Sequence, residues 1–139
     1  MQISTDIWSV TSYNELARDG FAVDRWNRLH LQEEQQVPYV ELLTRDEIGV
    51  FISVSDYQKS LGASISAWMP PGYTVLGTDG YGLSEARSEL RDYFEISPKY
   101  IVFTALCQLE KKGIIPLRVV LEFMQKAGID NDKINPSIV

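Results

Sequence analysis

Three short runs of β-branched and aromatic residues stand out in the pattern of hydrophobic and polar positions along the chain. They span Ile7–Val10, Val50–Val54 and Tyr73–Leu76. Residues of these types fit the pleated, half-buried surface of a sheet better than they fit a helix. The pattern therefore predicts three β-strands.

The first run leads into the tetrapeptide Ser12–Glu15, which has the spacing of a capping box. In that motif the serine oxygen and the glutamate carboxylate satisfy free backbone amides at the start of a helix. We therefore expect a helix with one apolar side from near Tyr13 to about Leu29. Gly20 should weaken or bend this helix near its middle, because glycine has a low helix propensity.

Further helices are predicted by start and stop signals and by apolar residues at helical spacing. Ser84 is a cap, Ser97-Pro98 is a start signal, and Gly113 and Gly128 are stop signals. The expected ranges are about Tyr39 to Leu43, Ser84 to Phe94, Pro98 to Gly113 and Pro116 to Ala127. Residues 32–36 should form a loop, and the tail beyond Gly128 should be irregular.

Strands that alternate with helices and are followed by two closing helices indicate an α/β fold with a parallel sheet. Three strands make a small sheet of this kind, since about five is usual. The low number suggests that an element is missing at the amino end. A chain of 139 residues without a linker or repeat is expected to be one domain, residues 1–139.

The net negative charge of the chain excludes some classes of binding partner. It carries 13 Lys and Arg against 19 Asp and Glu, for a net charge of −6, and its pI is about 4.7. Nucleic acid and an anionic membrane would both be repelled, so we expect neither as a partner. With the single Cys107 and no signal-peptide or membrane-spanning pattern, the expected compartment is the cytoplasm.

The glycine-rich turn that follows Leu76 is the sharpest candidate site. Its glycines at 77, 80 and 82 are spaced G-x-x-G-x-G, which matches neither the dinucleotide fingerprint nor the phosphate loop of nucleoside triphosphatases. Asp79 in this turn has no second carboxylate or histidine beside it in sequence. We therefore interpret the segment as a structural turn, in which Asp79 accepts hydrogen bonds from backbone amides of the turn itself.

The remaining candidate residues do not form a recognisable catalytic or metal site. His30 is the only histidine and is expected to stabilise a helix end or lie at the surface, and Cys107 is expected to be a small buried hydrophobe. Together they cannot supply a structural zinc site. The tail at Asp130–Asp132 begins like a calcium loop but does not continue as one.

Short polar residues also end each predicted strand, at Thr11-Ser12, Ser55-Asp56 and Thr78-Asp79. In open α/β sheets, ligands bind at that edge. The simpler interpretation is that these residues cap the helices that follow. No active site is predicted from these residues, and no catalytic, cofactor-binding or metal-binding residue is assigned.

Several ordered motifs resemble the carboxyl-terminal domain of the homodimeric, bacterial-type pyruvate dehydrogenase decarboxylating component. The matching stretches are Asp6–Gly20, Arg25–His30, Val37–Val40, Val75–Gly82, Gly128–Asp130 and Asn135-Pro136. The resemblance implies a transketolase C-terminal-like domain with three layers and a mostly parallel sheet, here lacking its first strand and helix. It also implies an intact homodimeric enzyme that binds thiamine diphosphate and magnesium through its other domains and passes its acyl group to a lipoyl component. None of that family's catalytic motifs occurs in this chain.

After the turn this sequence departs from the family pattern. The family continues with an Arg and then Ser-Asp-Thr-Arg, whereas residues 83–87 read Leu-Ser-Glu-Ala-Arg. Arg87 is therefore the only matching basic residue. As a structural turn or interface we single out Asp79, Gly80, Tyr81, Gly82 and Arg87.

Two functions from different classes follow. In the first, the chain is a non-catalytic part of a thiamine-dependent 2-oxo acid dehydrogenase that completes the subunit and supports dimer assembly. In the second, it is a freestanding α/β module that binds a small ligand at the strand ends. Because an incomplete sheet exposes strand edges and apolar surface, we also expect the isolated chain to self-associate.

Overall fold

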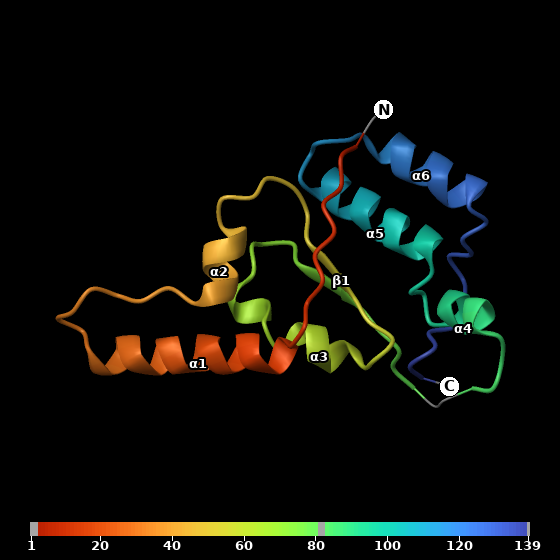
Figure 1. The fold of residues 1–139 in the computed structure, drawn as a ribbon. Helices are drawn as coiled ribbons and strands as arrows, with labels where there is room; N and C mark the ends of the chain where they lie inside the picture. The colour runs from red at the N-terminus through yellow and green to blue at the C-terminus, as the bar shows by residue number, and fades with distance from the viewer. Residues whose placement is uncertain (1–2, 81–82, 139) are drawn as a thin grey trace.

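The computed structural model describes residues 3–80 and 83–138, which form helices around a small central sheet (Figure 1). In chain order the elements are α1 (Tyr13–Leu29), α2 (Tyr39–Thr44), β1 (Ile52–Val54), α3 (Lys59–Ala63), the 3-10 helix η1 (Ser66–Trp68), β2 (Thr74–Leu76), α4 (Arg87–Tyr93), α5 (Pro98–Lys111) and α6 (Leu117–Lys126).

The sheet contains two parallel strands. β1 pairs with β2 in a register that places Ile52 beside Thr74 and Val54 beside Leu76. α3 lies in the connection between the two strands and packs against β2, while α5 packs against β1. In Figure 1, α1 to α3 lie on one side of the strands and α4 to α6 on the other. The prediction of an α/β fold with a parallel sheet is confirmed.

The predicted strand over Ile7–Val10 is wrong. This segment has no regular secondary structure, and every residue from 3 to 11 is exposed. A strand is stabilised by hydrogen bonds to a neighbouring strand. Among the described residues the sheet comprises β1 and β2 alone, so strand propensity at Ile7–Val10 finds no partner.

Helix boundaries agree with the local signals in most places. α1 begins at Tyr13, with Ser12 Oγ accepting a hydrogen bond from the Glu15 amide at 3.2 Å. α4 is the exception: it begins at Arg87, three residues after the predicted cap at Ser84. No signal in the sequence indicated α3 or η1, which are only five and three residues long.

Two hydrophobic clusters lie on the two sides of the sheet. The first contains Ala17, Val40, Ile65 and Trp68, and the second contains Leu106, Leu109, Ile115 and Val120. In the first cluster α1 approaches the Trp68 ring so closely that a Cβ at Gly20 would lie 2.5 Å from it. Gly20 therefore permits close packing, and α1 runs through it without interruption.

Candidate functional site

The carboxyl ends of β1 and β2 are joined by hydrogen bonds beyond the sheet itself. The Ser55 amide donates to the Leu76 carbonyl at 3.1 Å, and the Thr78 amide donates to the Tyr57 carbonyl at 2.9 Å. The Thr78 hydroxyl also donates to the Asp56 carbonyl. The predicted gathering of polar residues at one edge is confirmed for these two strand ends. It is wrong for Thr11-Ser12, because no strand precedes them and Ser12 caps α1.

Asp79 binds a backbone amide, but not one in its own turn. Its Oδ1 accepts a hydrogen bond from the Lys59 amide at 2.9 Å, and its Oδ2 lies 3.9 Å from Lys59 Nζ. Lys59 is the first residue of α3, so Asp79 satisfies a free amide at the start of that helix. The carboxylate thus links the strand-end turn to α3, and our expectation of a contact within the turn is corrected.

Gly80 adopts a backbone conformation that favours glycine, with φ of 113°. A Cβ at this position would lie 2.6 Å from the Pro136 carbonyl oxygen, so the turn also packs closely against the carboxyl-terminal tail. Arg87 is the exposed first residue of α4. The predicted site residues Tyr81 and Gly82 lie outside the described residues.

An ion pair that the sequence did not suggest borders the same edge. Arg91 of α4 binds the Asp56 carboxylate through Nε at 3.3 Å and Nη2 at 3.0 Å, and this hydrogen bonding raises the pKa of Arg91. Beside the pair lies an open hollow of about 320 Å³. It is lined by Val54, Ser55, Asp56, Arg91, Ile96, Pro98 and Ile101.

A hydroxyl cluster lies where α1 meets the sheet. Tyr13 Oη and Ser53 Oγ are 2.6 Å apart, and Tyr73 Oη donates to the Gly62 carbonyl at 2.9 Å. Burial raises the pKa of Tyr73 to about 12, so its phenol stays neutral at physiological pH. These hydroxyls hold α1, the sheet and α3 together and supply no activated nucleophile.

His30 and Cys107 occupy separate parts of the fold. The His30 Nδ1 is 2.8 Å from the Trp26 carbonyl, and its ring stacks on the Trp26 ring at the end of α1. Cys107 lies on α5, where burial raises the pKa of its thiol. His30 thus stabilises a helix end, and neither residue forms part of a catalytic arrangement with the other.

In the part of the chain that the structure describes, acidic side chains do not converge as they would to hold magnesium. A magnesium ion that carries a diphosphate needs convergent carboxylate or carbonyl oxygens. Asp79 is occupied by Lys59, and within residues 3–80 and 83–138 no three Asp, Glu, His or Cys side chains converge as metal ligands. In the same ranges, no helix is long and apolar enough to cross a membrane.

Known proteins resemble this chain over nearly its whole length. Residues 1–97 match the family described as the transketolase-like TK C-terminal domain. The chain is 45% identical over 135 residues to the pyruvate dehydrogenase E1 component of Pseudomonas aeruginosa, and 42% identical over 137 residues to that of Escherichia coli. These matches cover 96% and 98% of this chain but only 15% of each relative. The chain therefore belongs to the transketolase-like TK C-terminal domain family.

Proposed function

We propose that the chain is the carboxyl-terminal domain of a thiamine-diphosphate-dependent pyruvate dehydrogenase decarboxylating component. The observation that carries this proposal is the 42–45% identity to pyruvate dehydrogenase E1 components across 96–98% of the chain. The matches extend through α5 and α6, beyond the 97 residues of the family match. This supports residues 1–139 as one domain of a longer polypeptide.

Within that enzyme the domain completes the subunit and supports assembly of a homodimer. The polar groups at its strand ends are occupied by internal contacts, as the pairs Asp79 with Lys59 and Asp56 with Arg91 illustrate. Apolar side chains on its surface instead favour contact with other protein. Examples spread over the fold are Ile7, Trp8, Phe21, Leu31, Ile48, Leu117 and Leu121.

Catalysis belongs to the other domains of the proposed enzyme. They would hold thiamine diphosphate and magnesium, which together supply the decarboxylation chemistry, and they would deliver the acyl group to the lipoyl component of a cytoplasmic complex. This chain's own residues would bind and orient those domains. The isolated chain is accordingly proposed to be inactive and to bind neither cofactor.

A chimera tests the proposal. In the Pseudomonas aeruginosa relative, the segment that matches this chain is replaced by the 139 residues of the chain. A control variant lacks the segment. With thiamine diphosphate, magnesium and pyruvate supplied, the chimera should consume pyruvate and the deletion variant should not. A chimera that purifies as an intact oligomer but does not turn over pyruvate would contradict the proposal.

Calorimetry on the isolated chain tests the assignment of the cofactor to other domains. Titration with thiamine diphosphate and magnesium should produce no heat of binding. A micromolar dissociation constant would show that this domain contributes directly to the cofactor site, and it would overturn the proposed non-catalytic role.

A further inference from the structure

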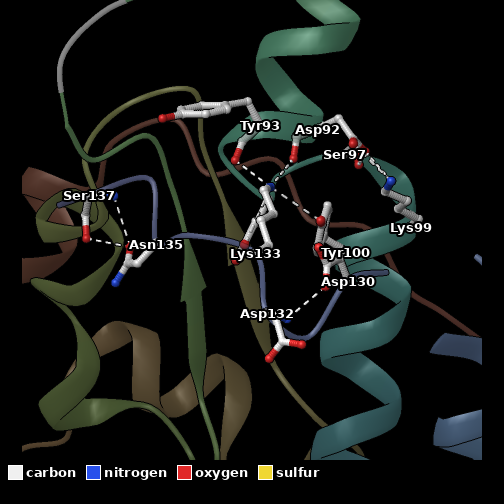
Figure 2. A network of polar contacts seen from close by, with 11 residues as sticks. Asp92, Tyr93, Ser97, Lys99, Tyr100, Asp130, Asp132, Lys133, Asn135 and Ser137 are labelled. Atoms are coloured by element: carbon white, nitrogen blue, oxygen red, sulfur yellow. Dashed lines mark hydrogen bonds and ion pairs between the residues drawn. The ribbon is translucent and has the colours of Figure 1, made fainter. Parts of the chain in front are cut away.

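The carboxyl-terminal tail, residues 129–138, returns from α6 across α5 to the strand-end turn. It has no regular secondary structure, but it contacts two elements that are far from it in sequence. One contact is at the carboxyl end of α4 and the other is at Gly80. Figure 2 shows the first of these contacts, with Lys133 between α4 and Tyr100 of α5.

Lys133 closes the carboxyl end of α4. Its ammonium donates to the carbonyls of Asp92 at 2.9 Å and Tyr93 at 2.8 Å, and it lies 3.4 Å from Tyr100 Oη. The carbonyls in the last turn of a helix have no partner within the helix, and the helix dipole is negative there, so a cation is favoured. The Lys133 side chain is only 23% exposed.

A carboxylate and an aromatic ring near Lys133 strengthen its contact with the end of α4. The Glu95 carboxylate is 3.6 Å from the ammonium, and the ammonium lies 4.9 Å from the centroid of the Tyr100 ring. The Asp92 side chain is directed instead to Lys99 and Ser97 at the start of α5. The two lysines near the end of α4 therefore bind different oxygen atoms of that helix. Lys133 binds main-chain carbonyls, whereas Lys99 pairs with the Asp92 carboxylate.

Three residues further along, the tail makes its second contact. Pro136 is buried, and its carbonyl lies against Gly80 at a distance that leaves no room for a side chain. Asn135 Oδ1 accepts hydrogen bonds from the Ser137 amide at 3.0 Å and from the Ser137 hydroxyl at 2.7 Å. This local turn fixes the backbone on either side of Pro136.

We propose that the tail couples the carboxyl end of α4 to the strand-end turn, and that the hydrogen bonds of Lys133 to α4 hold the tail in place. Release of Lys133 frees both contacts, because only two residues separate it from Pro136. The turn at Thr78–Gly80 also holds the start of α3 through Asp79. Attachment or release of the tail therefore changes the stability of the start of α3 and of the strand ends, which are more than 50 residues away in sequence.

Hydrogen exchange followed by NMR tests this coupling in the full 139-residue chain. The reporters are the Ile96 amide, which donates to the Arg91 carbonyl at the end of α4, and the amides of Thr78 and Lys59 at the turn. Lys133→Met should speed exchange at all three amides about tenfold, since charge-assisted hydrogen bonds are lost. Lys126→Met, at an exposed lysine in α6, should leave all three rates unchanged.

A reciprocal variant keeps the test decisive if Lys133→Met does not fold. Gly80→Ala disturbs the second contact and should speed exchange of the Ile96 amide at the distant end of α4. Faster exchange confined to the neighbourhood of each substitution would overturn the proposal, because the tail would then be attached without coupling the two elements. Equal acceleration by Lys126→Met would overturn it as well.

Discussion

The two ends of the described chain are both irregular, yet they differ in how they are held. Residues 3–11 are exposed throughout, including Ile7 at 94% and Trp8 at 50%. The tail is mostly polar, but Lys133 and Pro136 anchor it to α4 and Gly80. The more hydrophobic end is thus the more exposed one.

This difference shows that hydrophobic character alone does not order a segment. Ile7–Val10 would need a neighbouring strand to satisfy its amides and a surface to cover its side chains. Lys133 needs only the main-chain carbonyls at the end of a helix, which every helix presents. The amino-terminal segment is suited to contacts with further protein, whereas the tail completes its contacts within this domain.

Removal of the tail should have the largest effect on stability, and comparison with removal of the amino end should separate the two segments. Deletion of residues 129–139 should lower the free energy of unfolding by about 2 to 4 kcal/mol, because it removes charge-assisted hydrogen bonds and a buried proline. Deletion of residues 1–9 should change it by less than about 0.5 kcal/mol, since the side chains described there are exposed. Urea denaturation measures both, and equal losses would contradict the contrast.

A side chain at Gly80 should weaken the tail contact from the other side. Gly80→Val should cost about 1 to 3 kcal/mol, because of its φ of 113° and the nearby Pro136 carbonyl. Gly49 is a matched control, because its φ is 141° and no described atom beyond its chain neighbours lies within 4 Å of the point where a Cβ would stand. If Gly49→Val costs as much, backbone strain explains the loss and the tail contact does not.

The amino-terminal segment should drive self-association of the isolated chain. We expect dimers or larger species at tens of micromolar, with little dependence on salt because the contact is apolar. Ile7→Asp should weaken association about tenfold, in line with the burial of one large apolar side chain. Ile134→Asp, on the tail, should not. Sedimentation that shows a monomer for the unaltered chain would contradict this expectation.

Glu95 offers a smaller test of the α4 end. α4, α5 and α6 all end in the same motif, with Glu95, Gly113 and Gly128 at φ of 61°, 70° and 63°. Of these three helices only α4 lacks glycine there, and an L-residue in that conformation costs about 1 kcal/mol. Glu95→Gly should therefore stabilise the chain by roughly 0.5 kcal/mol after loss of the partly exposed pair with Lys133. A loss of stability would show that the ion pair dominates.

The smallest effect is expected from Asp92, whose contribution to stability should be lost at acidic pH. Burial of Asp92 opposes its ionisation, but hydrogen bonds from Lys99 and Ser97 outweigh burial and lower its pKa below 3.8. Its folded-state pKa is depressed, so its contribution is present above pH 3.8 and is lost as the pH falls through the lower folded value. The difference in urea midpoint between the unaltered chain and Asp92→Asn should shrink between about pH 6 and about pH 3. A constant difference would contradict this.

Sequence patterns predicted the elements that are stabilised locally. α1 begins at its capping serine, and Gly113 and Gly128 end α5 and α6, because these signals act within a few residues. Strand propensity at Val50–Val54 and Tyr73–Leu76 also succeeded, since each run has the other as a partner.

Features that depend on distant contacts could not be predicted. α3 is short, and its first amide is satisfied by Asp79, twenty residues later. Arg91 and Lys133 look like ordinary surface charges in the sequence until the fold places Asp56 and the end of α4 beside them. The strand predicted at Ile7–Val10 fails because strand propensity is local, whereas a strand also needs a partner, and no strand of the described sheet pairs with this segment.

Thiol labelling of residue 7 tests whether this domain is completed by the rest of a larger enzyme. Ile7→Cys is introduced into the isolated chain and into the Pseudomonas aeruginosa chimera, and maleimide modification is followed by mass spectrometry, with the peptide containing Cys107 as the internal reference. With the isolated chain diluted below the concentrations at which it self-associates, we expect rapid labelling at residue 7 there and strong protection in the chimera. Equal labelling rates in the two would contradict it.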